Sequence, residues 1–195
     1  MLDYKIDKDS ALIIVDVQRD FCLGGNLPVP CGDEIVYILN KYIQKFVEAR
    51  AQIYATRDWH PSDHISFKSE NGVWPPHCIQ NTEGAEFHKD LILPESSIVI
   101  SKATDSLKEA YSGFDETGLE EDLKQRNIRR VFIGGLATDY CVKSTVLDAL
   151  KLGFETILLK DAIRGVNVGS DDSERAIKEM IAKGVRIIKN FDSIN

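Results

Sequence analysis

The segment QIYATRDWHPSDH at 52–64 brings Asp58 and His60 to the end of an apolar run, and WPPHC at 74–78 adds His77. In an extended segment, residues two apart direct their side chains to the same side, so Asp58 and His60 form a ready pair of ligands. One carboxylate and two imidazoles suit a zinc, manganese or iron ion, and three protein ligands leave a position open for water or substrate. The pattern favours a catalytic metal site over its alternative, a hydrogen-bonded polar loop.

Two nearby side chains are candidates for a fourth ligand or for bracing the first three. His64 lies four residues after His60, and Glu70 precedes the WPPHC segment. Residues that hold a metal ligand in place are as much a part of such a site as the ligand itself. The sequence leaves the choice between His64 and Glu70 open.

A thiol follows a different apolar run, in GGLATDYCV at 134–142. The glycines permit a tight turn, Thr138 or Asp139 can cap the next helix, and Cys141 then falls in its first turn. Unpaired backbone N–H groups and the helix dipole favour the thiolate there, which is the nucleophilic form. The alternative is an inert cysteine that fills space beneath the helix.

An acid and a base end two further apolar runs, Asp16 in ALIIVD and Lys102 in IVISK. Taken singly, Asp16 could be a turn residue and Lys102 a surface residue. An ammonium group between a carboxylate and a thiol would instead hold the charges together, while the carboxylate accepts the thiol proton and later returns it. This chemistry requires Asp16, Lys102 and Cys141 to meet in space.

The elements that must position these residues alternate along the chain. Short β-rich runs predict strands, and amphipathic spacing or capping signals predict helices between them. The expected strands are 11–16, 52–56, 98–101, 130–135, 156–160 and 185–189, and the expected helices are 33–50, 117–126, 139–152 and 171–183. This order predicts a three-layer α/β fold with a mostly parallel sheet of about six strands, Rossmann-like topology and helices on both faces. Ligands bind beyond the carboxyl ends of such strands, where the candidate residues lie.

Length and composition limit the classes of protein that remain. The 195 residues contain no linker, internal repeat or low-complexity tract, so we expect a single domain over residues 1–195. A net charge of −7 and a pI near 5.1 disfavour a nucleic-acid or anionic-membrane partner. The segment 61–96 is long, polar and proline-rich, which in a compact domain favours a functional loop.

Cellular location follows from similar observations. No apolar run is long enough to span a bilayer, and the polar N-terminal segment is unlike a signal peptide, so we expect a cytoplasmic protein. Its four cysteines are then expected to be free thiols, although the sequence alone leaves a Cys22–Cys31 bridge open. A homo-oligomer is compatible with the sequence, which does not determine the oligomeric state.

Six ordered motifs give the chain a resemblance to a known family. They are VDVQRDF at 15–21, RDWHP at 57–61, WPPHC at 74–78, SKATD at 101–105, AYSGF at 110–114 and GGLATDYCV at 134–142. Together they resemble the nicotinamidase and pyrazinamidase branch of the isochorismatase-like hydrolases, over about residues 10 to 188. The resemblance implies hydrolysis of nicotinamide to nicotinate and ammonia, and of pyrazinamide to pyrazinoate.

The resemblance also implies a role for each motif. Cys141 is the nucleophile, Asp16 the base that activates it, and Lys102 the group that orients and neutralises the site. A divalent metal, first of all Zn²⁺ and otherwise Mn²⁺ or Fe²⁺, sits on Asp58, His60 and His77 and holds the pyridine nitrogen of the substrate.

The remaining implied residues surround the substrate. Backbone N–H groups of Ala137 and Cys141 form an oxyanion hole, with a cis peptide between Leu136 and Ala137. The residues that line the substrate ring in the family correspond here to Phe21, Leu27, Trp74, Tyr111 and Ala137.

Three other interpretations stay open at this point. A relative with the same Asp16, Lys102 and Cys141 could act on another small amide or on isochorismate, although the metal motif argues against it. A metal hydrolase could activate water on the ion and keep Cys141 as a structural residue. A thiol or metal-binding protein without catalysis is the last.

Overall fold

A computed structural model describes residues 5–193 and contains one six-stranded sheet with the order β3-β2-β1-β4-β5-β6. All of the strand pairings are parallel, which confirms the predicted α/β class. The strands are β1 (Ser10–Val15), β2 (Gln52–Asp58), β3 (Ile98–Lys102), β4 (Arg130–Leu136), β5 (Glu155–Arg164) and β6 (Arg186–Ile188). The chain starts in the middle of the sheet, builds outward to β3 and then returns to pair β4 with the other side of β1. Open α/β sheets bind ligands at this kind of switch point.

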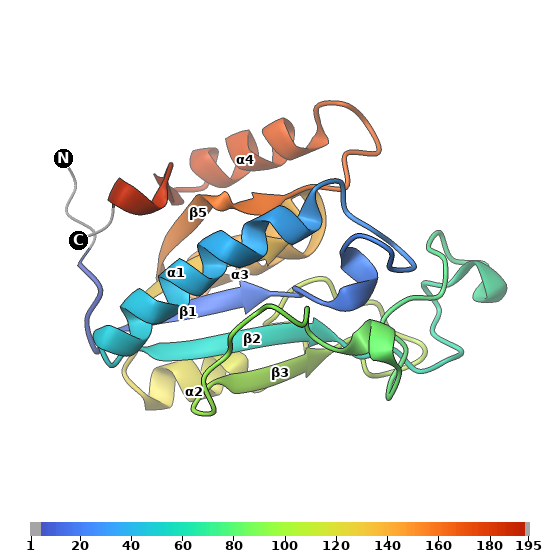
Figure 1. The fold of residues 1–195 in the computed structure, drawn as a ribbon, viewed down its shortest axis with the longest axis horizontal. Coiled ribbons are helices and arrows are strands. Elements are labelled where there is room, and N and C mark those ends of the chain that lie inside the picture. Colours follow the sequence, from blue (N-terminus) through green and yellow to red (C-terminus); the bar gives the residue numbers. More distant parts are fainter. Residues whose placement is uncertain (1–4, 194–195) are drawn as a thin grey trace.

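Helices cover both faces of the sheet, as expected for parallel strands joined by crossovers. They are α1 (Ile35–Glu48), α2 (Leu119–Gln125), α3 (Lys143–Lys151) and α4 (Asp172–Ala182). Figure 1 shows α1 crossing in front of β1, with α3 behind the sheet. The apolar side chains of α1 pack in one buried cluster, and those of α2, α3 and α4 pack in a second cluster.

Sequence pattern accounts for the two central elements of this arrangement. Every residue of β1 is buried, which fits a continuous apolar run between two layers of helices. In α1 the buried residues recur at helical spacing, as in Leu39, Tyr42, Ile43 and Phe46, while the intervening polar residues face outward. The two elements thereby place the ends of the central strands against a well-packed core.

Element boundaries differ from the prediction in two places that matter. Strand β1 was expected to end at Asp16 and ends one residue earlier, at Val15, because Asp16 adopts a left-handed φ of 48° and turns the chain. Strand β5 was expected to end at residue 160 but continues to Arg164. The charged pair Lys160 and Asp161 resembled a strand end, whereas the sheet continues past it to the buried Ala162 and Ile163.

A close approach between β1 and β4 explains one glycine. A Cβ atom on Gly135, whose φ is 128°, would lie 2.1 Å from the carbonyl oxygen of Val15. Only glycine therefore fits at this position. The two strands whose ends carry Asp16 and the Cys141 turn are drawn together there.

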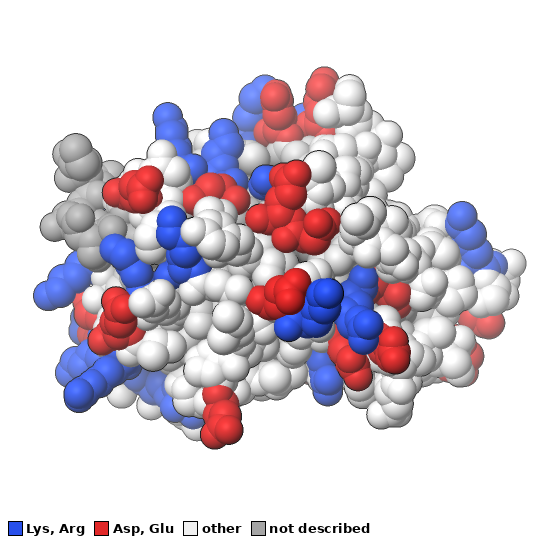
Figure 2. Space-filling view, in the orientation of Figure 1, with Lys and Arg blue, Asp and Glu red and all other residues white. Residues whose placement is uncertain are grey.

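The surface in Figure 2 carries acidic and basic side chains interspersed, without a single-sign field across that face. In the described part of the chain, no helix combines the length and apolar character that crossing a membrane requires. The segment between β2 and β3 has few regular elements, and consists largely of turns and two short 3₁₀ helices, Lys68–Glu70 and Glu83–Ala85.

Candidate active site

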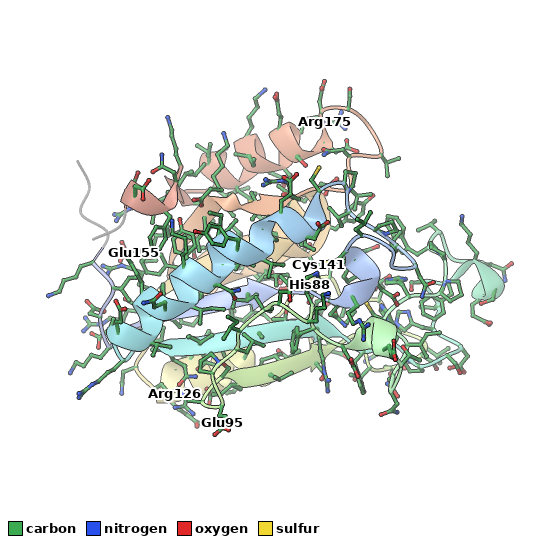
Figure 3. All side chains as sticks on the ribbon, viewed as in Figure 1. His88, Glu95, Arg126, Cys141, Glu155 and Arg175 are labelled. Atoms are coloured by element: carbon green, nitrogen blue, oxygen red, sulfur yellow. The ribbon has the colours of Figure 1, made fainter. Side chains whose placement is uncertain are left out.

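The carboxyl ends of four neighbouring strands meet at one edge of the sheet. Asp58 and Lys102 are register partners at the ends of β2 and β3, and Val15 pairs with Gly135 near the ends of β1 and β4. Figure 3 labels Cys141 just beyond the arrowhead of β1. Residues from distant parts of the chain therefore converge because parallel strands end at the same edge.

The ammonium group of Lys102 lies at the centre of this convergence. Its Nζ atom lies 3.4 Å from the Sγ atom of Cys141 and 2.9 Å from Oδ2 of Asp16. It also donates to Oδ1 of Asp58 and, at 3.2 Å, to the carbonyl of Ala110. Both Asp16 and Lys102 are fully buried. The structure thus brings Asp16, Lys102 and Cys141 together, and adds Asp58 as a second carboxylate on the same ammonium.

Burial and charge shift the ionisation of this group. Burial raises the pKa of Asp16, opposed by the Lys102 ammonium, and it raises the pKa of the Cys141 thiol well above its usual range. Burial alone would lower the pKa of Lys102, but the carboxylates of Asp16 and Asp58 outweigh it and hold that pKa well above normal. A thiol that is reluctant to ionise needs a base, and a carboxylate of raised pKa is a stronger one.

Asp16 is held so that one oxygen stays available. Its Oδ1 atom accepts a hydrogen bond from the Thr56 hydroxyl at 2.7 Å. Oδ2 makes the ion pair with Lys102 but accepts no hydrogen bond from the described residues. A carboxylate oxygen of Asp16 and the Cys141 sulfur lie within 4.8 Å of each other. Asp16 can therefore receive the thiol proton with little movement.

Cys141 lies in a wide turn and not in the first turn of an ordinary α-helix, which corrects the prediction. Residues Thr138–Val142 form a π-helical turn, and α3 begins only at Lys143. The predicted cis peptide between Leu136 and Ala137 is present immediately before this turn. The predicted cap is absent, since neither Thr138 nor Asp139 caps the helix through its side chain.

Asp58, His60 and His77 form a group that could hold a metal ion. One ligand atom from each lies within 4.8 Å of the others, and all three residues are buried. Both ring nitrogens of His60 have no hydrogen-bond partner among the described residues. The Nδ1 atom of His77 is bonded to the carbonyl of Pro75 at 2.8 Å, which leaves Nε2 for a ligand. Unpartnered buried nitrogens beside a carboxylate fit a divalent metal well.

Charge supports the same assignment. Burial lowers the pKa of His77, which favours the neutral imidazole that binds metals. Burial alone would raise the pKa of Asp58, but the Lys102 ammonium together with His60 and His77 outweighs it and lowers that pKa below its usual range. A second acidic group, Asp16, Asp58 and Cys141, also has its ligand atoms close together. The Lys102 ammonium contacts all three of these side chains and supplies the positive charge beside them.

Neither His64 nor Glu70, the two candidates for a fourth ligand, offers a ligand atom to the group of Asp58, His60 and His77. His64 uses both ring nitrogens, bonding Ser66 Oγ at 2.8 Å and the Lys108 carbonyl at 2.9 Å. Its ring lies 4.2 Å from that of His60, so it braces His60 by packing. Glu70 is exposed at the end of a short 3₁₀ helix and belongs to none of the metal-binding groups found among the described residues.

Gln18 holds Asp58 in place, a role that sequence reasoning did not assign. The Gln18 amide donates to the Asp58 carbonyl at 2.7 Å and accepts from the Asp58 amide at 2.8 Å. It also donates to the Ala85 carbonyl at 2.9 Å. The pairing between β1 and β2 ends at Val15, and beyond that point these side-chain contacts of Gln18 connect the two segments. Their partners lie 40 and 67 residues away, so the only sequence signal was the place of Gln18 in VDVQRDF.

Replacing Gln18 by leucine is expected to weaken zinc binding by about 10- to 100-fold, because a ligand loses its support. It should also lower the free energy of unfolding by about 1–3 kcal/mol per orphaned buried group. Competition with a chromophoric chelator measures the first effect, and urea unfolding measures the second. Gln44→Leu, at an exposed position of α1, is the control and should change neither. Unchanged zinc affinity in Gln18→Leu would contradict the role.

A small open pocket lies over the thiol and the metal-ligand group. It contains every substrate-wall residue named from the sequence, namely Phe21, Leu27, Trp74, Tyr111 and Ala137. Sequence reasoning missed four more, Val29, Glu109, Tyr140 and Val166. Tyr140 packs edge-on against Trp74 with ring centroids 5.1 Å apart, and Trp74 donates to the Tyr111 hydroxyl at 3.0 Å. Aromatic walls suit a flat ring.

Comparison with known proteins gives a consistent result. The isochorismatase domain family matches residues 10–190. The chain is 40% identical to the nicotinamidase of Escherichia coli, over 91% of this chain and 93% of that protein. It is 54% identical to the pyrazinamidase of Pyrococcus horikoshii solved in complex with zinc, with a TM-score of 0.89, covering 93% of this chain and 99% of that one. A protein of L. infantum, solved in complex with nicotinate, is 33% identical, with a TM-score of 0.90 and coverage of 100% and 99%.

Proposed function

The chain belongs to the isochorismatase domain family, and from this premise we propose that it hydrolyses nicotinamide to nicotinate and ammonia, and pyrazinamide to pyrazinoate. One observation carries the proposal. A buried thiol, ammonium and carboxylate lie beside a set of metal ligands, all at the base of one aromatic-walled pocket. The small amide substrate binds in this pocket. The proposal also takes residues 1–195 as one domain.

The chemistry begins with a proton transfer from the Cys141 thiol to Oδ2 of Asp16, the oxygen that accepts no hydrogen bond from the described residues. The thiolate attacks the amide carbon, and backbone N–H groups of Ala137 and Cys141 stabilise the oxygen as it gains charge. The C–N bond then breaks, and the leaving nitrogen takes the proton from Asp16 and departs as ammonia. Water attacks the resulting thioester with Asp16 again as base, which releases nicotinate and restores the thiol.

Lys102 acts throughout as a fixed positive charge. It stays protonated because Asp16 and Asp58 raise its pKa, and it lies 3.4 Å from the sulfur on which negative charge develops. Its contact with Asp58 links the thiol to the metal-ligand group. A substrate ring near His60 and His77 and an amide near Cys141 are therefore placed relative to each other by one buried side chain.

A divalent metal on Asp58, His60 and His77, with zinc as the first choice, fits the proposal. When bound, such an ion supplies an electrophilic position that takes the ring nitrogen of the substrate. Trp74, Tyr111 and Tyr140 then flank the ring, which sets the amide carbon against the sulfur.

The direct test is ammonia release from nicotinamide by the purified, zinc-loaded protein. Nicotinaldehyde, a known inhibitor ligand of the yeast nicotinamidase, provides a second measurement. Its carbonyl should form a thiohemiacetal with Cys141 and so protect that thiol from iodoacetamide, and peptide mass spectrometry then shows which cysteine was protected. No ammonia release, or an adduct on Cys22, Cys31 or Cys78 instead, would refute the proposal.

Replacing Asp16 by asparagine is expected to lower kcat by about 10²- to 10⁴-fold, because the base is lost while the shape is kept. Zinc content should remain near one ion per chain, since Asp16 lies outside the proposed ligand set. Ammonia-release kinetics and elemental analysis of the same sample measure the two quantities. Loss of zinc would mean that Asp16 belongs to the metal site.

A further inference from the structure

The carboxylate of Asp139 holds the loop that follows β5 onto the turn that carries Cys141. Its Oδ1 atom accepts from the amide of Val166 at 2.9 Å, and its Oδ2 atom accepts from the amide of Asn167 at 2.8 Å. Asp139 is buried, with 8% of its surface exposed, and it does not cap the helix that follows. Two charge-assisted hydrogen bonds to successive amides are a strong attachment. The contact joins segments 27 and 28 residues apart.

The rest of this loop is attached elsewhere. The side-chain oxygen of Asn167 accepts from the amide of Ser173 at 3.0 Å, and the amide of Gly169 donates to Asp172 at 2.7 Å. Those partners belong to the first turn of α4, where Figure 3 labels the nearby Arg175. The far half of the loop is therefore fixed to α4, and the half that contains Val166 is fixed to the Cys141 turn through Asp139.

Val166 is a wall of the pocket over Cys141. The preceding Gly165 packs closely against both attachments, although the Ser173 hydroxyl, which has no hydrogen-bond partner among the described residues, could rotate away from an added side chain. A Cβ atom there would lie 1.9 Å from Ser173 Oγ and 3.0 Å from Asp139 Oδ1. The loop is thus packed against both of its attachments.

We propose that Asp139 is a positioning residue that holds Val166 as a specificity-determining wall of the substrate pocket. The proposal rests on the proposed function, since the wall acts on the ring of the amide substrate. Asp139 is not among the residues that line the pocket. It acts through the backbone of Val166, so its effect falls on binding of the ring and on discrimination between rings of different size.

Asp139→Asn is the first test. Asparagine keeps the shape but offers an NH₂ group where one amide needs an acceptor, so the loop detaches on one side. The KM for nicotinamide is expected to rise about tenfold or more, with kcat within about threefold of wild type. Asp171→Asn removes the same charge from an exposed position at the end of this loop and should change neither constant. An unchanged KM, or a fall in kcat alone, would overturn the proposal.

Gly165→Ala tests the attachment from the loop side and covers the case in which Asp139→Asn does not fold. The added methyl group meets Ser173 Oγ, so this variant should also raise KM. Gly165→Ala combined with Ser173→Ala removes that contact and should recover part of the loss. Failure of the double variant to recover, with Gly165→Ala impaired, would mean that the loop position does not act through this packing.

The preference between rings of different size is a measurement that a purely structural role of Asp139 would leave unchanged. Val166→Ala enlarges the pocket, and relative to nicotinamide it should raise kcat/KM about tenfold for nicotinamide bearing a methyl group at ring position 5, which is not adjacent to the ring nitrogen. Asp139→Asn should shift this ratio in the same direction. An unchanged ratio in both variants would overturn the role of the wall.

Hydrogen exchange separates this proposal from the proposed function. Peptides that cover residues 165–167 should exchange faster in Asp139→Asn than in wild type, whatever substrate the enzyme accepts. If the wild-type protein leaves nicotinamide intact, the proposed function is refuted, but this measurement still tests whether Asp139 holds the loop. Unchanged exchange in these peptides would refute only the role of Asp139.

Discussion

Replacing Cys141 by alanine is expected to lower kcat for nicotinamide by at least about 10³-fold, because the thiolate is the covalent nucleophile. Zinc content and the free energy of unfolding should stay close to wild type, since the sulfur is outside the ligand group of Asp58, His60 and His77. Ammonia-release kinetics, elemental analysis and urea unfolding measure the three quantities. The nicotinaldehyde adduct should disappear from the same variant.

Cys31→Ala is the matched control, because Cys31 is exposed and lies outside the pocket. It should retain wild-type turnover. Retention of more than about one per cent of turnover by Cys141→Ala would contradict a nucleophilic role. In that case a metal-activated water would be the attacking group, and Cys141 would be a structural residue.

Removal of the metal is expected to collapse the preference for nicotinamide over benzamide. Benzamide has the same amide and nearly the same shape but no ring nitrogen, and a site built to hold a polar atom rejects such an analogue by about 10³-fold or more. Without the metal nothing distinguishes the two rings, so their ratio of kcat/KM should fall to within about tenfold of unity. His77→Ala should give the same collapse.

The comparison separates two roles for the ion. If the ion activates water instead of holding the ring, chelation should lower kcat/KM for both amides by the same factor and leave the ratio of the two values unchanged. His88→Ala serves as the control, because His88 is outside the metal-ligand group, and it should keep the wild-type ratio. Restoration of the ratio by added zinc would show that chelation, and not damage, caused the change.

Local sequence determined the elements and the edge at which the chemistry gathers. Alternation of short apolar runs with amphipathic segments was enough to predict a parallel sheet between helices, because side-chain periodicity reports which face each element buries. Asp16, Asp58 and Lys102 were predicted to converge for the same reason, since parallel strands end at a common edge. The motifs around His77 and Cys141 added the remaining candidates and the resemblance to a family.

Only the tertiary structure decided how these side chains share their partners. Lys102 contacts Asp58 as well as Asp16 and Cys141, a link that no local pattern encodes. His64 turns both nitrogens to protein partners, and Asp139 attaches a distant loop instead of capping its own helix. Each outcome includes a contact with a residue at least 27 positions away in the sequence. Periodicity describes how one element meets the core, whereas the direction of a polar side chain is set by whichever donors and acceptors the folded chain brings beside it.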